Sequence, residues 1–375
     1  MHPSRALQFS PFRRSCATRI PRGKVVGKRW RIISKLGEGG FGAVYKVEDI
    51  NTNQLAALKA EANGERGSVL RLEALILKRL AGKPHVAQLL QSGKKEFYSY
   101  IVMTLLGQSL DDILRRIGKV CSVSTQIRIG INLLYGIKQI HDVGFIHRDV
   151  KPSNMALGYK YSEQSRIFHI FDFGLAREFV VVEDGRRKMR RPRPGTIRYC
   201  SANVQERGEQ GRMDDLWCLL YVLVELRGPL PWSRVRDRHK VLRMKKDIEL
   251  EELLENCPVE LIAFGEHISS LNYYLRPDYA LLYRLLEQVM RSGKISFSDP
   301  YDWEKTKTKE KRSFDTSVSK EATVTPDNTP AQSVEKRTVS LQSPLLTPEQ
   351  TFQSAEQEVN SPFPAEFFSH DALGF

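Results

Sequence analysis

The chain has 375 residues, too long for one small domain and suited to two lobes with tails. Hydrophobic residues make up 41% of it, enough for a sizeable core over most of the length. The net charge of +14 favours anionic partners, namely acidic or phosphorylated protein segments, nucleic acid or anionic lipid, and does not choose among them. Five scattered cysteines, never spaced as Cys-x-x-Cys, argue against a disulfide framework or zinc site and favour a reducing compartment.

Neither a membrane span nor a secretory signal is expected. The longest apolar run, residues 216–224, is far shorter than the roughly 20 residues that cross a bilayer, and the N-terminus has no apolar core of a signal peptide. Residues 1–28 are rich in proline and arginine and are expected to form a disordered basic arm. A mitochondrial presequence is the alternative, although Pro3, Pro11 and Pro21 would break its amphipathic helix.

The residue pattern predicts an α+β layout with strands first and helices second. The expected strands cover residues 30–33, 44–47, 55–60 and 97–103, and the expected helices cover 68–80, 125–141 and 214–226. The last helix is apolar nearly all round, which is typical of a helix in the centre of a lobe, and Asp214 or Asp215 is expected to cap it. Residues 306–375 are rich in Ser, Thr, Pro, Glu and Lys and are expected to form a disordered tail.

A glycine-rich turn, residues 36–44, joins the first two predicted strands. Its G-x-G-x-x-G pattern places glycines at Gly37, Gly39 and Gly42, where a backbone without side chains can approach phosphates closely. Dinucleotide-binding folds use this spacing between a strand and a helix, whereas here the turn runs from strand to strand and Val44 follows it. The pattern therefore predicts a phosphate-binding loop, with a merely flexible hairpin as the alternative.

A lysine on the third predicted strand, Lys59, has a candidate partner on the helix that follows. Glu73 lies within an apolar stripe of that helix, and burying an unpaired carboxylate is costly. We therefore expect Glu73 to pair with Lys59, as in kinases, where the pair holds the lysine against the α- and β-phosphates. The alternative is a Glu73 side chain that reaches out to water.

Residues 147–154 read His-Arg-Asp-Val-Lys-Pro-Ser-Asn and match the catalytic-loop pattern H-R-D-x-x-x-x-N. In that pattern Asp149 orients the substrate hydroxyl or accepts its proton, and Lys151 neutralises the γ-phosphate. Asn154 and Asp172, the latter in a downstream Asp-Phe-Gly triplet, are expected to hold Mg²⁺. Phosphoryl transfer needs positioning and positive charge around the phosphate oxygens, and this ordered set of motifs therefore predicts an ATP- and Mg²⁺-dependent phosphotransferase.

With these motifs, residues 27–305 resemble the casein kinase 1 family of protein kinases, and within it the tau-tubulin kinase-like branch. The segments that carry the resemblance to that branch are residues 213–217, 230–232, 267–271, 276–279 and 299–304. The resemblance implies a serine/threonine protein kinase with the two-lobed fold over residues 29–305. Its N-lobe would span about 29–103, its hinge 104–108 and its C-lobe 109–305.

The same resemblance implies how the nucleotide binds. Met103 is similar to the gatekeeper, and the backbone of Leu106 would bind adenine. The full set of residues expected around ATP is Leu36, Gly37, Gly39, Gly42, Val44, Ala57, Lys59, Met103 and Leu106. Two departures from the family, Cys200 in place of a small residue and Ala202 in place of isoleucine, lie near the presumed substrate groove and leave substrate preference open.

The stretch from Gly174 to Gly195 contains no serine, threonine or tyrosine, so we expect no activating phosphorylation there. It carries instead a basic strip, which we expect to recruit acidic or phosphorylated protein segments; a surface that only raises solubility is the alternative. By resemblance, two more arginines match positions at which the family binds an anion. The candidate anion-binding residues are Arg190, Arg191, Arg193, Arg198 and Arg236.

The rival function is a pseudokinase, a scaffold that binds nucleotide or acidic partners without turnover. Its usual sign is loss of the residues equivalent to Lys59, Asp149 or Asp172, and the sequence keeps all three. A nucleic-acid-binding module would show an interleaved aromatic and basic patch, so nucleic acid is not an expected partner. We expect a monomer that acts on protein substrates in the cytoplasm, the nucleus or both.

Overall fold

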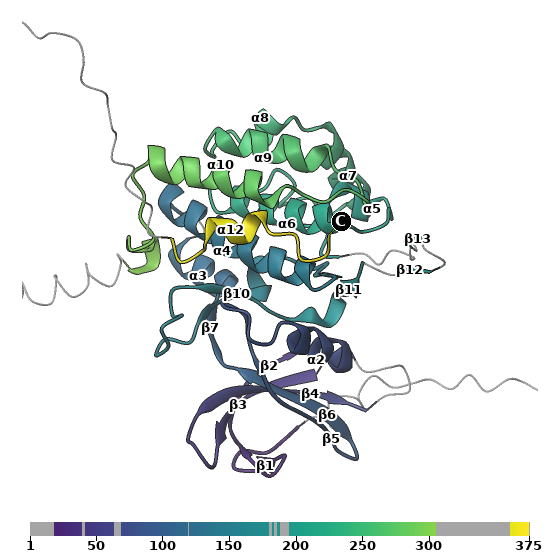
Figure 1. The fold of residues 1–375 in the computed structure, drawn as a ribbon, viewed down its shortest axis with the longest axis vertical. Coiled ribbons are helices and arrows are strands. Elements are labelled where there is room, and N and C mark those ends of the chain that lie inside the picture. The colour runs from purple at the N-terminus through teal and green to yellow at the C-terminus, as the bar shows by residue number, and fades with distance from the viewer. Residues whose placement is uncertain are drawn as a thin grey trace, which may run out of the picture.

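The computed structural model describes residues 19–39, 42–63, 69–118, 120–179, 182–183, 186–187, 195–304 and 361–374. They form a small lobe around an antiparallel sheet and a larger lobe built mainly of helices (Figure 1). This is the two-lobed α+β arrangement that the sequence predicts. Within the described residues, no helix combines the length and apolar character that a membrane crossing requires.

The small lobe is a six-stranded sheet in the order β1-β2-β3-β4-β6-β5, with every neighbouring pair antiparallel. Its strands are β1 (Val25–Val26), β2 (Trp30–Gly39), β3 (Gly42–Asp49), β4 (Leu55–Ala62), β5 (Leu89–Lys94) and β6 (Tyr98–Thr104). Buried and partly exposed residues alternate along β3, as expected for a strand with one face on a core. Trp30, Val47 and Leu58 are fully buried in that core.

Helix α2 (Val69–Arg79) packs against the second face of this sheet, and its residues Leu70, Ile76 and Leu77 are buried at helical spacing. Glu73 is buried with them, so the helix carries a carboxylate on its apolar face. The packing of α2 therefore decides where that carboxylate lies.

The larger lobe surrounds two buried helices, α4 (Val123–Asp142) and α6 (Arg212–Glu225), which pack against each other. Nearly every residue of α6 is buried, as its apolar sequence predicts. Asp214 caps this helix by accepting from the Gly211 N–H at 2.8 Å. The other helices are α3 (Leu110–Ile117), α5 (Ala202–Gln205), α7 (Arg238–Asp247), α8 (Leu250–Leu253), α9 (Glu260–Ser269), α10 (Tyr279–Ser292) and α12 (Ala365–Ser369).

Short strands and 3-10 turns follow the small lobe in the chain, and the catalytic loop and the Asp-Phe-Gly triplet fall among them. They are β7 (Leu106–Ser109), β8 (Phe145–Ile146), η1 (Pro152–Asn154), β9 (Met155–Gly158), β10 (Phe168–Ile170), η2 (Phe173–Leu175), β11 (Arg177–Glu178), β12 (Val182–Glu183) and β13 (Arg186–Arg187). Strand β6 ends at Thr104 and β7 begins at Leu106, so the chain passes from lobe to lobe here, within the predicted hinge.

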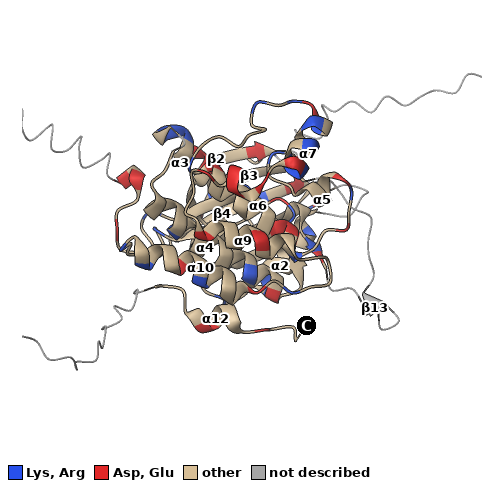
Figure 2. Cartoon of the chain, turned by 90° about the horizontal axis from the view of Figure 1, so that it is seen from above, with Lys and Arg blue, Asp and Glu red and all other residues tan. Residues whose placement is uncertain are grey.

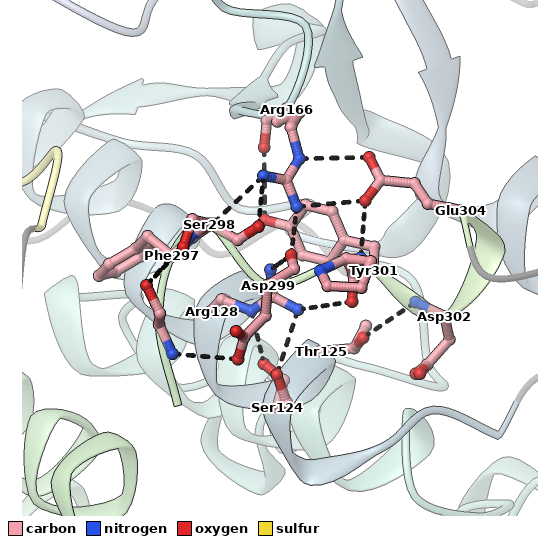
Figure 3. Close-up of polar contacts among 12 residues, drawn as sticks. Ser124, Thr125, Arg128, Arg166, Phe297, Ser298, Asp299, Tyr301, Asp302 and Glu304 are labelled. Atoms are coloured by element: carbon pink, nitrogen blue, oxygen red, sulfur yellow. Dashed lines mark hydrogen bonds and ion pairs between the residues drawn. The ribbon is translucent and has the colours of Figure 1, made fainter. Parts of the chain in front are cut away.

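Residues 297–304 are fixed to the larger lobe by two arginines (Figure 3). The guanidinium of Arg128 on α4 lies 4.1 Å from the ring centroid of Tyr301, a cation–π contact. Arg166 forms an ion pair of 3.1 Å with Glu304. These contacts hold the end of the larger lobe against the helix at its centre.

The expectation of a disordered arm over residues 1–28 is wrong for residues 19–28. The side chain of Ile20 is buried in the core of the small lobe, and its backbone N–H donates to the Tyr45 hydroxyl at 3.0 Å. Strand β1 then pairs with β2. Apolar residues among the arginines therefore anchor residues 19–28 to the small lobe. The basic composition of the segment concealed this signal of packing. Residues 1–18 lie outside the described part of the chain.

The expectation of a disordered tail is also wrong for residues 361–374. This segment packs on the larger lobe, and the side chains of Phe363 and Phe368 are fully buried there. Three phenylalanines within six residues were a signal that this segment packs on the protein. The polar composition of the rest of the tail outweighed that signal in the prediction of disorder. In Figure 1 the segment, with α12, crosses the surface of the larger lobe as a yellow ribbon.

Candidate active site

Lys59 and Glu73 form the buried pair that the apolar stripe of α2 predicts. Lys59 Nζ donates to Glu73 Oε2 at 2.7 Å, and the Glu73 residue is only 1% exposed. Burial raises the pKa of Glu73, although the ammonium of Lys59 opposes this shift. The alternative of a glutamate that reaches out to water is therefore excluded.

The same lysine also contacts the Asp-Phe-Gly triplet of the larger lobe. Lys59 Nζ donates to Asp172 Oδ1 at 2.8 Å, so one ammonium joins two carboxylates from two lobes. Burial acts to lower the pKa of Lys59, but the negative charges of Glu73 and Asp172 outweigh it, and the pKa is raised. Asp172 adopts a left-handed backbone conformation with φ of 64°, which an aspartate tolerates better than most residues.

Asp149 lies at the centre of the catalytic loop with three polar partners. Thr196 Oγ1 donates to Asp149 Oδ1 at 2.6 Å, and Lys151 Nζ lies 2.6 Å from Oδ2. The amide nitrogen of Asn154 donates to the backbone oxygen of Asp149 at 2.9 Å and to Oδ2 at 3.1 Å. The structure therefore brings the four predicted residues Asp149, Lys151, Asn154 and Asp172 to the interface of the two lobes, the last through Lys59.

Asp215 on α6 fixes the backbone of the catalytic loop. Its position in the sequence did not reveal this role. Its carboxylate accepts from the backbone N–H of His147 at 2.7 Å and of Arg148 at 2.8 Å, and it lies 3.0 Å from His141 Nε2. Burial acts to raise the pKa of Asp215, but its hydrogen bonds with the His141 ring and with the His147 backbone N–H help to hold the pKa low. The sequence signal was a pair of aspartates, of which one caps the helix and the other fixes the loop.

Arg148, beside the catalytic aspartate, contacts protein groups. Its Nε donates to the side-chain oxygen of Gln210, which is buried, and its Nη1 donates to the Leu175 carbonyl at 3.3 Å. Nothing in the sequence pattern singled out Gln210, because a lone glutamine in a loop carries no spacing signal. Gln210 lies just before α6, outside the stretch 174–195 that has no hydroxyl side chain.

The described glycines of the glycine-rich turn lie near the end of β2 and at the start of β3. Gly42 has φ of 121°, and a Cβ there would lie 2.0 Å from the Ala60 carbonyl, so packing requires this glycine. A Cβ at Gly37 or Gly39 would meet no described atom within 4 Å, so packing against those atoms does not explain these two glycines. Open space above a backbone without side chains suits a phosphate-bearing ligand.

The residues expected around adenine lie on β2, β4, β6 and β7. Ala57 on β4 pairs in register with Met103 on β6, and both side chains are largely buried. Leu36 on β2 remains 53% exposed although it is apolar. Leu106 follows the hinge and pairs with Gly158. Ala57 and Met103 therefore lie side by side in the sheet, with Met103 just before the hinge, and the adenine-binding role of these four residues stays a prediction.

The predicted anion-binding arginines are only partly described. Arg190, Arg191 and Arg193 lie outside the described residues. The described Arg198 has its Nε 3.2 Å from Glu225, and Arg236 is exposed. Burial raises the pKa of the Cys200 thiol, which favours the interpretation of this cysteine as a packed side chain rather than a reactive thiol.

A charge-balance test follows from the buried pair. Lys59→Met leaves the Glu73 carboxylate buried without this partner and should lower the free energy of unfolding at neutral pH by about 3 kcal/mol. Because the native-state pKa of Glu73 is raised above its ordinary 4.5, the lost stability should grow as pH rises from 4.5 through the native pKa. Urea unfolding of the variant at pH 5 and pH 8 measures this difference.

The matched control is Lys59→Met combined with Glu73→Gln, which has no carboxylate to charge. It should recover stability relative to Lys59→Met at pH 8 and show less dependence on pH. Equal stability losses for Lys59→Met at both pH values would mean that the burial of Glu73 has no electrostatic cost, and the interpretation of the pair would fail.

Comparison with known proteins agrees with this geometry. The protein kinase domain family matches residues 30–284. A Caenorhabditis elegans protein named as a putative serine/threonine-protein kinase is 50% identical over 294 residues, which cover 76% of this chain and 85% of the relative. The inactive tau-tubulin kinase ttbk-6 of the same nematode is 40% identical over 249 residues, 62% of this chain and 86% of the relative. Casein kinase I homolog 3 of Schizosaccharomyces pombe is 31% identical over 300 residues, 76% of this chain and 68% of the relative.

Protein kinase domains use ATP and a divalent metal ion, and the carboxylates and lysines described above are of the types this chemistry needs. The chain therefore belongs to the protein kinase family, and within it to the serine/threonine kinases of the casein kinase 1 family, tau-tubulin kinase-like branch.

Proposed function

We propose that this chain transfers the γ-phosphate of ATP to serine and threonine hydroxyls of protein substrates at the site around Asp149. The observation that carries the proposal is the assembly of Lys59, Glu73 and Asp172 by hydrogen bonds of 2.7 and 2.8 Å across the two lobes. Such an arrangement positions a lysine for the nucleotide phosphates without any change of the described fold.

Asp149 is positioned to bind the attacking hydroxyl. Its Oδ1 already accepts a hydrogen bond from a threonine hydroxyl, that of Thr196, at 2.6 Å. A substrate hydroxyl bound in the same way would lose its proton to Asp149 as its oxygen bonds to the γ-phosphorus. The bond from that phosphorus to the bridging oxygen then breaks and ADP leaves with the electron pair. Lys151, 2.6 Å from the aspartate, would offset the negative charge of the transferred group.

The donor atoms at the site fit a hard divalent cation. Asp172 offers a carboxylate, and Asn154 offers its amide oxygen because its amide nitrogen donates to Asp149. Mg²⁺ prefers such oxygen ligands and is commonly held by one or two protein groups together with substrate phosphates. We infer that these two residues hold Mg²⁺, which when bound neutralises charge on the phosphate oxygens.

A pseudokinase remains the second candidate, because a relative named as an inactive tau-tubulin kinase is 40% identical over 249 residues. This chain keeps Lys59, Asp149 and Asp172, and the hydrogen bonds that join Lys59 to Asp172, and Lys151 and Thr196 to Asp149, support a catalytic role for them. The geometry therefore favours the enzyme.

Two substitutions test the assignment of the active site. Asp149→Asn removes the proton acceptor and Asp172→Ala removes the metal carboxylate, so each should reduce phosphate incorporation into casein by at least about 10³-fold. The protein is first treated with phosphatase, and the wild type should stay active because the stretch 174–195 offers no hydroxyl for activation.

Folding of both variants is checked by their thermal unfolding. If the variants and the wild type incorporated phosphate at the same rate, the assignment would be wrong. If all three were silent while the wild type still bound Mg²⁺-ATP, the scaffold function would replace the kinase.

The preference for acidic or phosphorylated substrates is a further part of the proposal. Helix α7 presents lysines and arginines at one edge of the molecule, shown in blue in Figure 2. Lys245 fixes this helix to the end of the activation segment, because its Nζ donates to the carbonyls of Ile197 and Cys200 at 2.6 Å. The basic surface therefore lies beside the segment that would bind the substrate, and Arg236 lies just before it.

Charge reversal tests this preference. Replacing Arg190, Arg191 and Arg193 with glutamate should lower kcat/KM for an acidic serine peptide by about tenfold, since each lost charge contact weakens binding modestly. A neutral serine peptide should be affected much less. The triple variant Lys24→Glu, Lys94→Glu, Lys95→Glu, on exposed residues of the small lobe, changes the net charge by the same amount and serves as the control. Equal losses on both peptides would overturn the recruitment model.

A further inference from the structure

The C-terminal segment, residues 361–371, lies on the larger lobe in contact with α4 and α10 (Figures 1 and 2). Two of its aromatic side chains, Phe363 and Phe368, are 1% and 0% exposed. Such burial is found in a protein core and is unusual for a segment that reaches the domain only after a long polar stretch. The segment therefore occupies a built site rather than an open surface.

Three aromatic contacts define this site. Phe368 stacks on Tyr283 of α10, with ring centroids 4.3 Å apart and planes at 12°. Phe367 packs on Tyr135 of α4 at 4.2 Å, and the ammonium of Lys138 lies 4.3 Å from its ring centroid. Each contact joins one phenylalanine of the segment to one of the two helices.

Phe363 makes the third contact, and it reaches beyond the two helices. Its ring centroid lies 4.9 Å from that of Tyr135, 5.3 Å from that of His85 and 5.7 Å from that of Phe297. His85 belongs to the connection between α2 and β5, so this phenylalanine touches an element that leads directly to the helix carrying Glu73.

Polar contacts fix both ends of the segment. At its start, Ser361 forms a side-chain hydrogen bond with Tyr283 of α10, and its Oγ accepts from the Phe363 N–H at 3.1 Å within the segment. At its end, Arg276 donates to the His370 carbonyl at 2.9 Å and lies 3.5 Å from the Asp371 carboxylate. Aromatic burial in the middle and polar contacts at the ends define one register for the segment.

The connection between α2 and β5 is held from two sides. On one side, Gln139 of α4 donates to the Pro84 carbonyl at 2.8 Å. On the other, the ring of His85 packs between Tyr135 and Phe363, at centroid distances of 5.6 and 5.3 Å. His85 also has a left-handed backbone, with φ of 57°, so surrounding contacts must maintain this conformation.

We propose that residues 361–371 are an intramolecular ligand of the larger lobe, and that their docking braces the α2–β5 connection and so steadies α2 with Glu73. The occupant is the chain's own C-terminal segment, because its three phenylalanines each meet an aromatic partner and its ends are fixed by Ser361 and Arg276. The effect on catalysis rests on the proposed function, whereas docking and bracing do not.

The first experiment compares full-length wild type with the variant Phe363→Ala, Phe368→Ala. Hydrogen–deuterium exchange of residues 80–88 should become at least about tenfold faster in the variant, because the contact with His85 is lost. The matched control is Glu366→Ala, which alters an exposed residue of α12, the helix that carries Phe368. It should leave exchange unchanged. Unaltered exchange in the double variant would overturn the bracing.

The second experiment asks whether the site on α4 and α10 recognises the segment. A fluorescent peptide of residues 359–373 should bind the full-length double variant, whose own segment has lost two anchors, and should bind the wild type at least about tenfold more weakly. Adding Tyr283→Ala to the double variant should abolish binding. No binding to the folded double variant would overturn the docking. A concentration-dependent dimer of the wild type, lost in the double variant, would instead assign the site to a second copy.

The third experiment measures catalysis. The double variant should lose about three- to tenfold in kcat with casein, and Glu366→Ala should lose none. If kcat were unchanged although exchange was faster, docking would have no effect on the position of Glu73. That part of the proposal would then be wrong. If wild type has no kinase activity, the exchange and peptide experiments still decide the docking, so failure of the proposed function is distinguishable from failure of this inference.

Discussion

A buried ion cluster is the constraint on which the rest of this structure depends. Glu73 can be buried in the small lobe only because Lys59 offsets its charge at 2.7 Å, and Lys59 in turn contacts Asp172 of the larger lobe. The three charges come from β4, α2 and the loop before η2, so any shift of one lobe against the other separates them. The fold of both lobes serves to bring these groups together.

A second buried carboxylate does the corresponding work within the larger lobe. Asp215 accepts two backbone N–H groups of the catalytic loop, at 2.7 and 2.8 Å, and thereby fixes the backbone that carries Asp149. Asp215 is on α6, the most buried helix of the lobe. The catalytic loop is therefore hydrogen-bonded directly to the core of the lobe. Charge is placed by packing in both lobes: α2 positions Glu73, and α6 positions Asp215.

Much of this arrangement could be predicted from the sequence, for identifiable reasons. Glu73 was identifiable because a carboxylate in an apolar stripe needs a partner, and the catalytic loop because its residues are adjacent in sequence. Asp215 and Gln210 act on residues more than sixty positions away, so no local spacing marks them. Composition misled at both ends: arginines concealed the anchor at Ile20, and serines, threonines and prolines concealed the buried Phe363 and Phe368.

The docked C-terminal segment adds a third contact between distant parts of the chain. It touches α4 and α10 of the larger lobe, and also His85, which follows α2. The position of Glu73 thus depends on the sheet it packs against, the lysine it pairs with and the connection that follows its helix.

The most direct test of this account is the rate of a single phosphate transfer from saturating ATP to casein by the wild type and by Glu73→Gln. Glutamine keeps the shape of the side chain but removes the charge that holds Lys59. We expect a rate lower by about 10²-fold, with the thermal stability of the variant close to that of the wild type. An unchanged rate in the folded variant would contradict it, because the buried pair would then have no part in positioning the lysine.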